Sequence, residues 1–137
     1  MVLMLTNDEV ASVLTMPACI EALDDIFREY AAGEAVRKPK TEVCVPDAIP
    51  GWLYRSSTME GASRKYGTFA MRFHSNMVSR SADGTRLANY AVQPGTYLGL
   101  VFVFDIHNAE LQAIMPDGVF QHMRTGASAG IAAKYLA

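Results

Sequence analysis

Signals for export and for membrane insertion are missing from this sequence. The first residues, MVLMLTNDEV, contain no basic residue ahead of their short apolar run, whereas a secretory signal peptide begins with a positively charged segment. A continuous apolar run at 97–104, YLGLVFVF, is too short to cross a bilayer, which takes about 20 residues in a helix. We therefore expect a cytoplasmic protein that makes no contact with a membrane.

Cysteine is scarce, and the common catalytic and nucleotide-binding motifs are absent. Cys19 and Cys44 lack CxxC spacing, so we expect reduced core residues, with a bridge or a metal pair as the alternative. GxSxG, P-loop and GxGxxG patterns do not occur, and the histidines show no ligand spacing. We therefore expect no metal site and no nucleotide-binding fold within these residues.

Neither sign of charge is in excess. The sequence has 12 basic and 14 acidic residues, a net charge of -2, which excludes the basic surface that nucleic-acid binding needs. The chain has 137 residues, of which 50% are hydrophobic. A chain of this length can bury about two thirds of its unfolded surface, and its hydrophobic content excludes disorder. Since no repeat or linker divides the sequence, we expect one domain over 1–137.

Two helices are expected at the start of the chain. Thr6 and Glu9 form a capping box, in which each side chain accepts a hydrogen bond from the backbone N–H of the other, and this predicts a short helix over 8–14. Pro17 suits the first position of a second helix. Apolar residues then recur every three or four positions until Gly33 ends the helix, so one face is expected to pack on a sheet.

The pattern then changes to short strands bordered by glycine and proline. Strands are predicted at 41–45, 52–58, 68–74, 97–104 and 110–115, with a long loop or hairpin extension at 75–95. The strand at 97–104 is apolar throughout, which is typical of a strand covered on both faces. The order of elements indicates an α+β fold, with N-terminal helices packed on a mostly antiparallel sheet.

The last segment, QHMRTGASAGIAAKYLA at 121–137, predicts a helix that begins at 121 or 122. Its first turn would hold Arg124 and no acid, although the free N–H groups of a helix start favour negative charge. We interpret Arg124 and Thr125 as an anion site, because a helix start and a guanidinium both bind carboxylate or phosphate. The small residues that follow predict close packing on several faces of this helix.

Three cations stand next to strands or helix starts in this pattern: Lys40, Arg72 and Arg124. If the sheet brings them together, they form a pocket for the carboxylate of a small acid, in which each charge-assisted hydrogen bond contributes about 1.5–3 kcal/mol. The alternative is that each cation pairs with a local acid or faces water. His122 is likewise open to two interpretations, as a general acid or as a structural residue.

The stretch RTGASAGIAAKYLA, the opening helix pair and the segment LQAIMPDG together resemble the N-terminal half of the ornithine cyclodeaminase and mu-crystallin family, over essentially the whole chain. The resemblance implies a substrate-binding and dimerising domain whose strands join those of a partner subunit. A Rossmann domain that binds NAD(H) or NADP(H) would follow it. The implied chemistry is hydride transfer at the α carbon of an amino acid or imine.

The implied substrate site holds a carboxylate with basic residues. Arg124 matches the arginine of the RTAA motif that marks the family. Arg72, in AMRFHSN, stands where the family usually has lysine, and Lys40, in KPKT, stands where it usually has arginine. Both exchanges preserve the charge, although lysine and arginine do not hold a planar carboxylate in the same way.

Three other positions bear on the cofactor and the substrate. Thr96 falls near a family threonine that approaches the cofactor, and Thr125 is assigned to the cofactor with it. Family members that take ornithine carry an acid just before the methionine matched by Met59, where this chain has Ser57. A carboxylate for a distal ammonium is therefore missing at that position.

We accordingly expect 1–137 to be the substrate-carboxylate-binding part of an NAD(P)-dependent amino-acid enzyme, truncated before the Rossmann domain and inactive alone. The reaction would be the deaminating cyclisation of ornithine to proline or related imine and amino-acid dehydrogenase chemistry. The expected partners are a small amino or imino acid and a second copy of the chain; NAD or NADP belongs to the full-length protein and no cofactor to this part alone. The alternatives are a non-catalytic dimeric module that binds an amino or keto acid, and an aggregation-prone remnant without a ligand.

Overall fold

The computed structural model describes residues 1–80, 87–90 and 99–136. The helices in the described residues are α1 (Asn7–Val13), α2 (Met16–Ala32) and α3 (Gly118–Leu136). The strands in the described residues are β1 (Leu3–Met4), β2 (Ala35–Arg37), β3 (Thr41–Pro46), β4 (Trp52–Ser63), β5 (Thr68–Arg80), β6 (Leu87–Tyr90), β7 (Gly99–Asp105) and β8 (Leu111–Pro116).

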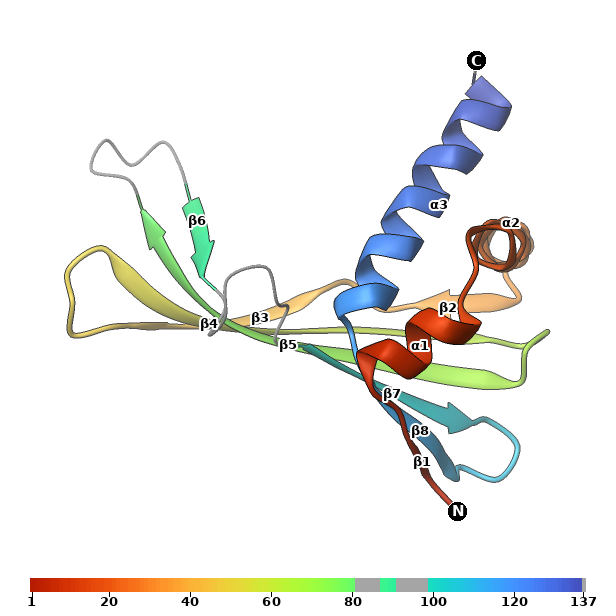
Figure 1. Cartoon of the computed structure of the whole chain (residues 1–137), viewed down its shortest axis with the longest axis horizontal. Coiled ribbons are helices and arrows are strands. Elements are labelled where there is room, and N and C mark those ends of the chain that lie inside the picture. The colour runs from red at the N-terminus through yellow and green to blue at the C-terminus, as the bar shows by residue number, and fades with distance from the viewer. Residues whose placement is uncertain (81–86, 91–98, 137) are drawn as a thin grey trace.

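The long hairpin of β4 and β5 forms the middle of the sheet (Figure 1). β2 and β3 pair with the two halves of β4, and β7 and β6 pair with the two halves of β5. β8 and then β1 complete the order on the β7 side, and β1 is the strand that runs parallel to its neighbour. The described residues thus form an α+β fold with a mostly antiparallel sheet, as the sequence predicts.

All three helices of the described residues gather on one side of this sheet (Figure 1). On β7, Val101 points toward them and is 4% exposed, whereas Leu100 points the other way and is 41% exposed. The prediction that this strand is covered on both faces is therefore wrong for the described residues. The apolar sequence of a strand does not show whether its second face is covered by a helix of the same chain or by another molecule.

Local sequence signals set the helix ends. The Glu9 N–H donates to Thr6 Oγ1 over 3.2 Å, and the Thr6 N–H donates to Glu9 Oε2 over 2.8 Å, so the capping box is confirmed. α2 has proline in its first turn, and Gly33 ends it in the left-handed region at φ 76°, a conformation that favours glycine. α1 begins at Asn7, one residue before the predicted start.

The core strands are confirmed, and the sequence underestimates their length. β4 continues to Ser63 and β5 to Arg80, because each strand finds a second partner beyond the first. β1 and β2 were not predicted, since two or three residues are too few to show alternation. Cys19 is buried, as predicted, but Cys44 is exposed, because β3 lies at the sheet margin and all its residues are exposed.

α2 and α3 pack closely, as the small residues of α3 predict. Ala127 is fully buried. A Cβ added at Gly126 would lie 3.1 Å from Met16 Cε, and one at Gly130 would lie 3.5 Å from Ile20 Cδ1. The absence of side chains on this stretch of α3 therefore lets α2 lie against it.

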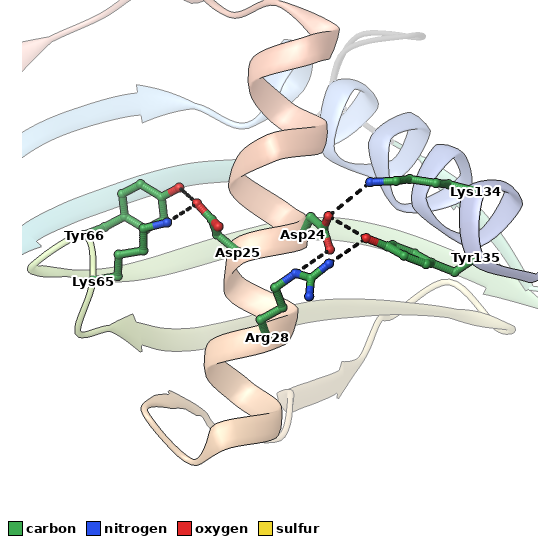
Figure 2. A network of polar contacts seen from close by, with 7 residues as sticks. All are labelled: Asp24, Asp25, Arg28, Lys65, Tyr66, Lys134 and Tyr135. Atoms are coloured by element: carbon green, nitrogen blue, oxygen red, sulfur yellow. Dashed lines mark hydrogen bonds and ion pairs between the residues drawn. The ribbon is translucent and has the colours of Figure 1, made fainter.

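Two acidic side chains on α2 fix this helix to its neighbours (Figure 2). Asp24 Oδ2 accepts a hydrogen bond of 2.9 Å from the Tyr135 hydroxyl near the end of α3. Asp25 Oδ2 accepts one of 2.8 Å from the Tyr66 hydroxyl and pairs with Lys65, both in the β4–β5 turn. α2 is thereby attached to α3 through Asp24 and to the central hairpin through Asp25.

We expect the Asp25 contacts to make stability pH-dependent. Hydrogen bonds from Lys65 and Tyr66 hold the pKa of Asp25 below its usual 3.8. A carboxyl group whose pKa is lowered by folding stabilises the fold above its unfolded pKa, and it loses this contribution as the pH falls through the folded pKa. Asp25→Asn should therefore lower the melting temperature at pH 7, and the difference from wild type should vanish below the folded pKa.

The melting temperatures of both proteins, followed by circular dichroism from neutral to acidic pH, check this expectation. Glu110→Gln serves as the control, because the Glu110 side chain is exposed at the β7–β8 turn. A deficit of Asp25→Asn that stays constant at every pH would contradict the assignment.

Candidate functional site

A buried ion pair joins the central hairpin to the start of α3. Arg72, on the helix side of β5, donates to Asp117 Oδ2 from Nε over 2.7 Å and from Nη2 over 2.6 Å. The Asp117 side chain is 0% exposed and that of Arg72 is 16% exposed. Asp117 Oδ1 has no hydrogen-bond partner in the part of the chain that the structure describes. A buried charge of this kind depends on its partner.

Arg124, on α3, is half-buried and is affected by the charges of this pair. Its Nε and Nη2 donate to Gln121 Oε1 over 3.1 and 2.9 Å, so its acceptor is a neutral amide. Burial lowers the pKa of Arg124, the positive charge of Arg72 lowers it further, and Asp117 acts in the opposite sense. The charges of Arg72 and Asp117 therefore both act on the Arg124 guanidinium.

The position of Arg124 on α3 differs from the prediction. α3 begins at Gly118 rather than at 121 or 122, so Arg124 lies in the second turn and the free N–H groups of the helix start do not surround it. The start is earlier because the Asn7 side chain reaches the Val119 N–H over 3.4 Å. Gly118 leaves the room for it, since a Cβ there would lie 3.1 Å from Asn7 Oδ1.

Lys40 is held at the margin of the sheet. It forms an ion pair with Glu42, whose Oε1 also lies 4.0 Å from Arg55 Nη1. The charge of Lys40 contributes to lowering the pKa of His74, but it is not among the groups that affect Arg124. The structure therefore brings Arg72 and Arg124 together and places Lys40 with a local acid, which is the alternative that the sequence left open for each cation.

His74 follows Arg72 on the same face of β5 and lies opposite the buried Ser57 of β4. Burial lowers the pKa of His74, and the charges of Arg72, Arg55 and Lys40 lower it further against the opposing effect of Asp117. The imidazole is therefore neutral at pH 7, where it can both donate and accept a hydrogen bond. The two-residue spacing of Arg72 and His74 on a strand is visible in the sequence, but it assigns His74 no role.

Asp117 was missed altogether. Asp117 and Gly118 form an Asp-Gly dipeptide, which is typical of a turn, and nothing in the neighbouring sequence indicates a partner 45 residues away on β5. Thr125 is exposed and its hydroxyl donates to the Gln121 carbonyl over 2.8 Å. Thr96 lies outside the described residues.

The described residues do not fit a dinucleotide site of their own. A Rossmann site needs a glycine-rich turn between a parallel strand and a helix, whereas β8 leads into α3 through Asp117 and a single glycine, Gly118. Among residues 1–80, 87–90 and 99–136, no group of acidic, histidine or cysteine side chains is arranged to hold a metal ion. No helix in those ranges has the length and apolar character to cross a membrane.

Solved structures share this fold. A probable ornithine cyclodeaminase from Bordetella pertussis superimposes with a TM-score of 0.73 at 16% identity, over 97% of this chain and 36% of that one. An archaeal alanine dehydrogenase dimer with bound NAD gives a TM-score of 0.69 at 25% identity, over 98% of this chain and 37% of that one. The Δ1-pyrroline-2-carboxylate reductase of Thermococcus litoralis, in complex with NADH and L-proline, gives 0.70 at 21% identity, over 97% and 37%.

This chain thus spans little more than a third of the length of the solved proteins it matches. The comparison with curated proteins found no match. A model of the ornithine cyclodeaminase/mu-crystallin family matches residues 1–137. The family match over the full length agrees with the α+β fold that this chain shares with a probable cyclodeaminase, a dehydrogenase and a reductase. The chain therefore belongs to the ornithine cyclodeaminase/mu-crystallin family.

Proposed function

We propose that this chain is the substrate-binding part of an NAD(P)-dependent amino-acid enzyme, and that Arg72 and Arg124 hold the carboxylate of a small amino or imino acid. The observation that carries the proposal is the excess of positive charge in a half-buried place. The Asp117 carboxylate is paired with Arg72, whereas Arg124 donates to the neutral amide of Gln121 and is exposed to the positive charge of Arg72. A substrate carboxylate would supply the missing negative charge, because charge-assisted hydrogen bonds to guanidinium are strong and can be made in pairs.

His74 completes the proposed site as a neutral group on the face of Arg72. Its burial and the surrounding cations keep it uncharged, so it would not compete with the arginines for the carboxylate. A neutral imidazole beside a bound amino or imino group can accept or donate a proton, as general acid–base chemistry requires.

The hydride carrier in this proposal is NAD or NADP, held by the remainder of a longer protein that acts in the cytoplasm. The proposal is supported by family membership and by two solved relatives that bind NAD or NADH. Both relatives are longer than this chain, which covers 37% of each. The cofactor would accept or supply hydride at the substrate α carbon, while the residues described here bind and orient the substrate. By itself the chain is expected to be inactive, and cyclodeamination and amino-acid dehydrogenation both remain within the proposed class.

Arg124→Ala is expected to weaken the saturable binding of L-alanine to the 137-residue chain. Removing one charge-assisted contact of this strength should weaken binding about 10- to 100-fold. Isothermal titration calorimetry measures the dissociation constant directly. Arg64→Ala is the matched control, because Arg64 is exposed in the β4–β5 turn and lies outside the site.

Two results would contradict the proposed function. If titration of the wild-type protein with L-alanine or L-proline gives no saturable heat, the proposed carboxylate site is wrong. Equal losses of affinity in Arg124→Ala and Arg64→Ala would show that general surface charge, and not the site, attracts the ligand. Circular dichroism spectra of all variants establish that each one is folded.

We also propose a homodimer that forms through the sheet face without helices. On that face Val43, Val45 and Leu100 are 62%, 50% and 41% exposed, and apolar surface of this kind marks an interaction site. Leu100→Lys should therefore convert a dimer into a monomer in sedimentation velocity, whereas Val13→Glu, a change at a residue 74% exposed on α1, should not. A wild-type monomer would contradict the proposal.

A further inference from the structure

A cavity of about 760 Å³ lies between α2, α3 and the strands beneath them. Small residues face it from several elements, among them Ala22 on α2, Gly61 on β4 and Ala70 on β5. Longer side chains at these places would fill the space, as they do in close-packed interiors. The volume falls in the range of small-molecule sites, about 300–1,000 Å³.

The helix above this cavity is fixed in place at its polar edge. Asp24 joins α2 to α3 and Asp25 joins it to the β4–β5 turn (Figure 2). Glu29, which is buried, accepts a hydrogen bond of 2.7 Å from the backbone N–H of Lys65. These contacts fix the position of α2 relative to α3 and to the β4–β5 turn.

The lining is apolar, with basic residues as its charged members. Ile26 and Phe27 on α2 and Phe120 on α3 contribute apolar surface. Among the described residues that line the cavity none is aspartate or glutamate, and the charged ones are Arg37 and Arg124. An apolar group with an anionic end suits such a lining, whereas an ammonium group buried here would find no carboxylate among the lining residues, which is costly.

The cavity and the proposed carboxylate site meet at Arg124. Arg124 lines the cavity and lies within electrostatic reach of Arg72. Along β5, Ala70 belongs to the cavity floor and Arg72 is the next residue on the same face. A molecule whose carboxylate is bound at the two arginines can therefore extend directly into the apolar space.

We infer that the α2 cavity receives the side chain of the substrate, and that this side chain is apolar and extended. The substrate class is then an amino or imino acid with an aliphatic or aromatic side chain, rather than a diamino acid. This inference rests on the proposed function, because it takes the carboxylate site at Arg72 and Arg124 as its starting point.

Calorimetric titration of the 137-residue chain with L-alanine, L-norleucine and L-lysine tests the inference. Each buried methylene group tightens binding about fourfold, so norleucine should bind about 10- to 60-fold more tightly than alanine, with full burial as the upper limit. Lysine, whose chain is of similar length but ends in an ammonium group, should bind no more tightly than alanine. The heat-capacity change should be more negative for norleucine than for alanine, as burial of apolar surface requires.

Variants that fill the cavity separate the side-chain site from the carboxylate site. Ala22→Phe from above and Ala70→Leu from below should each remove the preference for norleucine and leave alanine binding unchanged. Ala31→Phe is the matched control, because Ala31 is exposed on α2 and lies outside the cavity. Because the two variants change opposite walls of the cavity, the test can still be made with one of them if the other does not fold.

The outcomes distinguish the two proposals. If the wild-type protein does not bind L-alanine, both the proposed function and this inference are wrong. Saturable alanine binding with equal affinity for norleucine, or tighter binding of lysine, would overturn the inference alone. A crystal structure of the norleucine complex in which protein side chains, from this chain or a second copy, occupy the cavity would also overturn it.

Discussion

Asp117→Ala is expected to destabilise the fold by about 3–5 kcal/mol, because it leaves the positive charge of Arg72 buried without a partner. The Arg72 side chain is 16% exposed, and two of its guanidinium nitrogens donate to Asp117 Oδ2. Chemical denaturation, followed by circular dichroism, measures the free energy of unfolding for the variant and for wild type.

A double-mutant cycle separates the charge effect from the loss of packing. Arg72→Met in the Asp117→Ala background removes the unpaired charge, and replacing both members of a buried pair costs far less than removing one. The double variant should therefore recover most of the lost stability. A double variant as unstable as the sum of the two single variants would show that the pair does not couple.

Gly99→Ala is expected to cost about 3 kcal/mol through overpacking. A Cβ at this position would lie 2.2 Å from Asp117 Oδ2 and 2.4 Å from Asp117 Cγ. Because the Asp117 carboxylate is fully buried and fixed by Arg72, it cannot move away without breaking the ion pair. The variant should therefore weaken ligand binding at Arg72 as well as stability, and both are measured on the same preparation.

Gly130→Ala is the control for this prediction. Gly130 lies inside α3, where a Cβ would make an ordinary contact of 3.5 Å with Ile20 Cδ1. Alanine is favoured over glycine in a helix by up to about 1 kcal/mol, so this variant should be as stable as wild type or more stable. Similar losses in the two variants would indicate that any added methyl group is harmful, and the specific role of Gly99 would be wrong.

The parts of the fold that depend on neighbouring residues could be predicted from the sequence. The capping box of Thr6 and Glu9 and the Gly33 helix end are local devices, and the structure has both. The start of α3 was placed too late because it depends on Asn7, which is far away in the sequence. β1 and β2 escaped prediction for the same reason, since each is defined by its partner strand rather than by its own residues.

The candidate site shows the same division between local and distant information. The sequence identifies Arg72 as a basic residue on a strand but does not show which face of the sheet the helices cover, and the motif around Arg124 indicates the last helix as part of the site. Asp117 could not be found from sequence pattern, because its partner is chosen by the registers of β5 against β7 and of β7 against β8. The pairing of Lys40 with Glu42 was foreseen only as the alternative, since neighbouring opposite charges give no sign of which contact forms.

The most direct test of the account is the nuclear magnetic resonance of the arginine side chains during titration with L-alanine. If Arg72 and Arg124 bind one carboxylate, their Nε–H signals shift together and saturate with one dissociation constant, while the signal of Arg64 stays unchanged. Shifts of the same size at all three arginines, or no shift at Arg72 and Arg124, would contradict a shared carboxylate site.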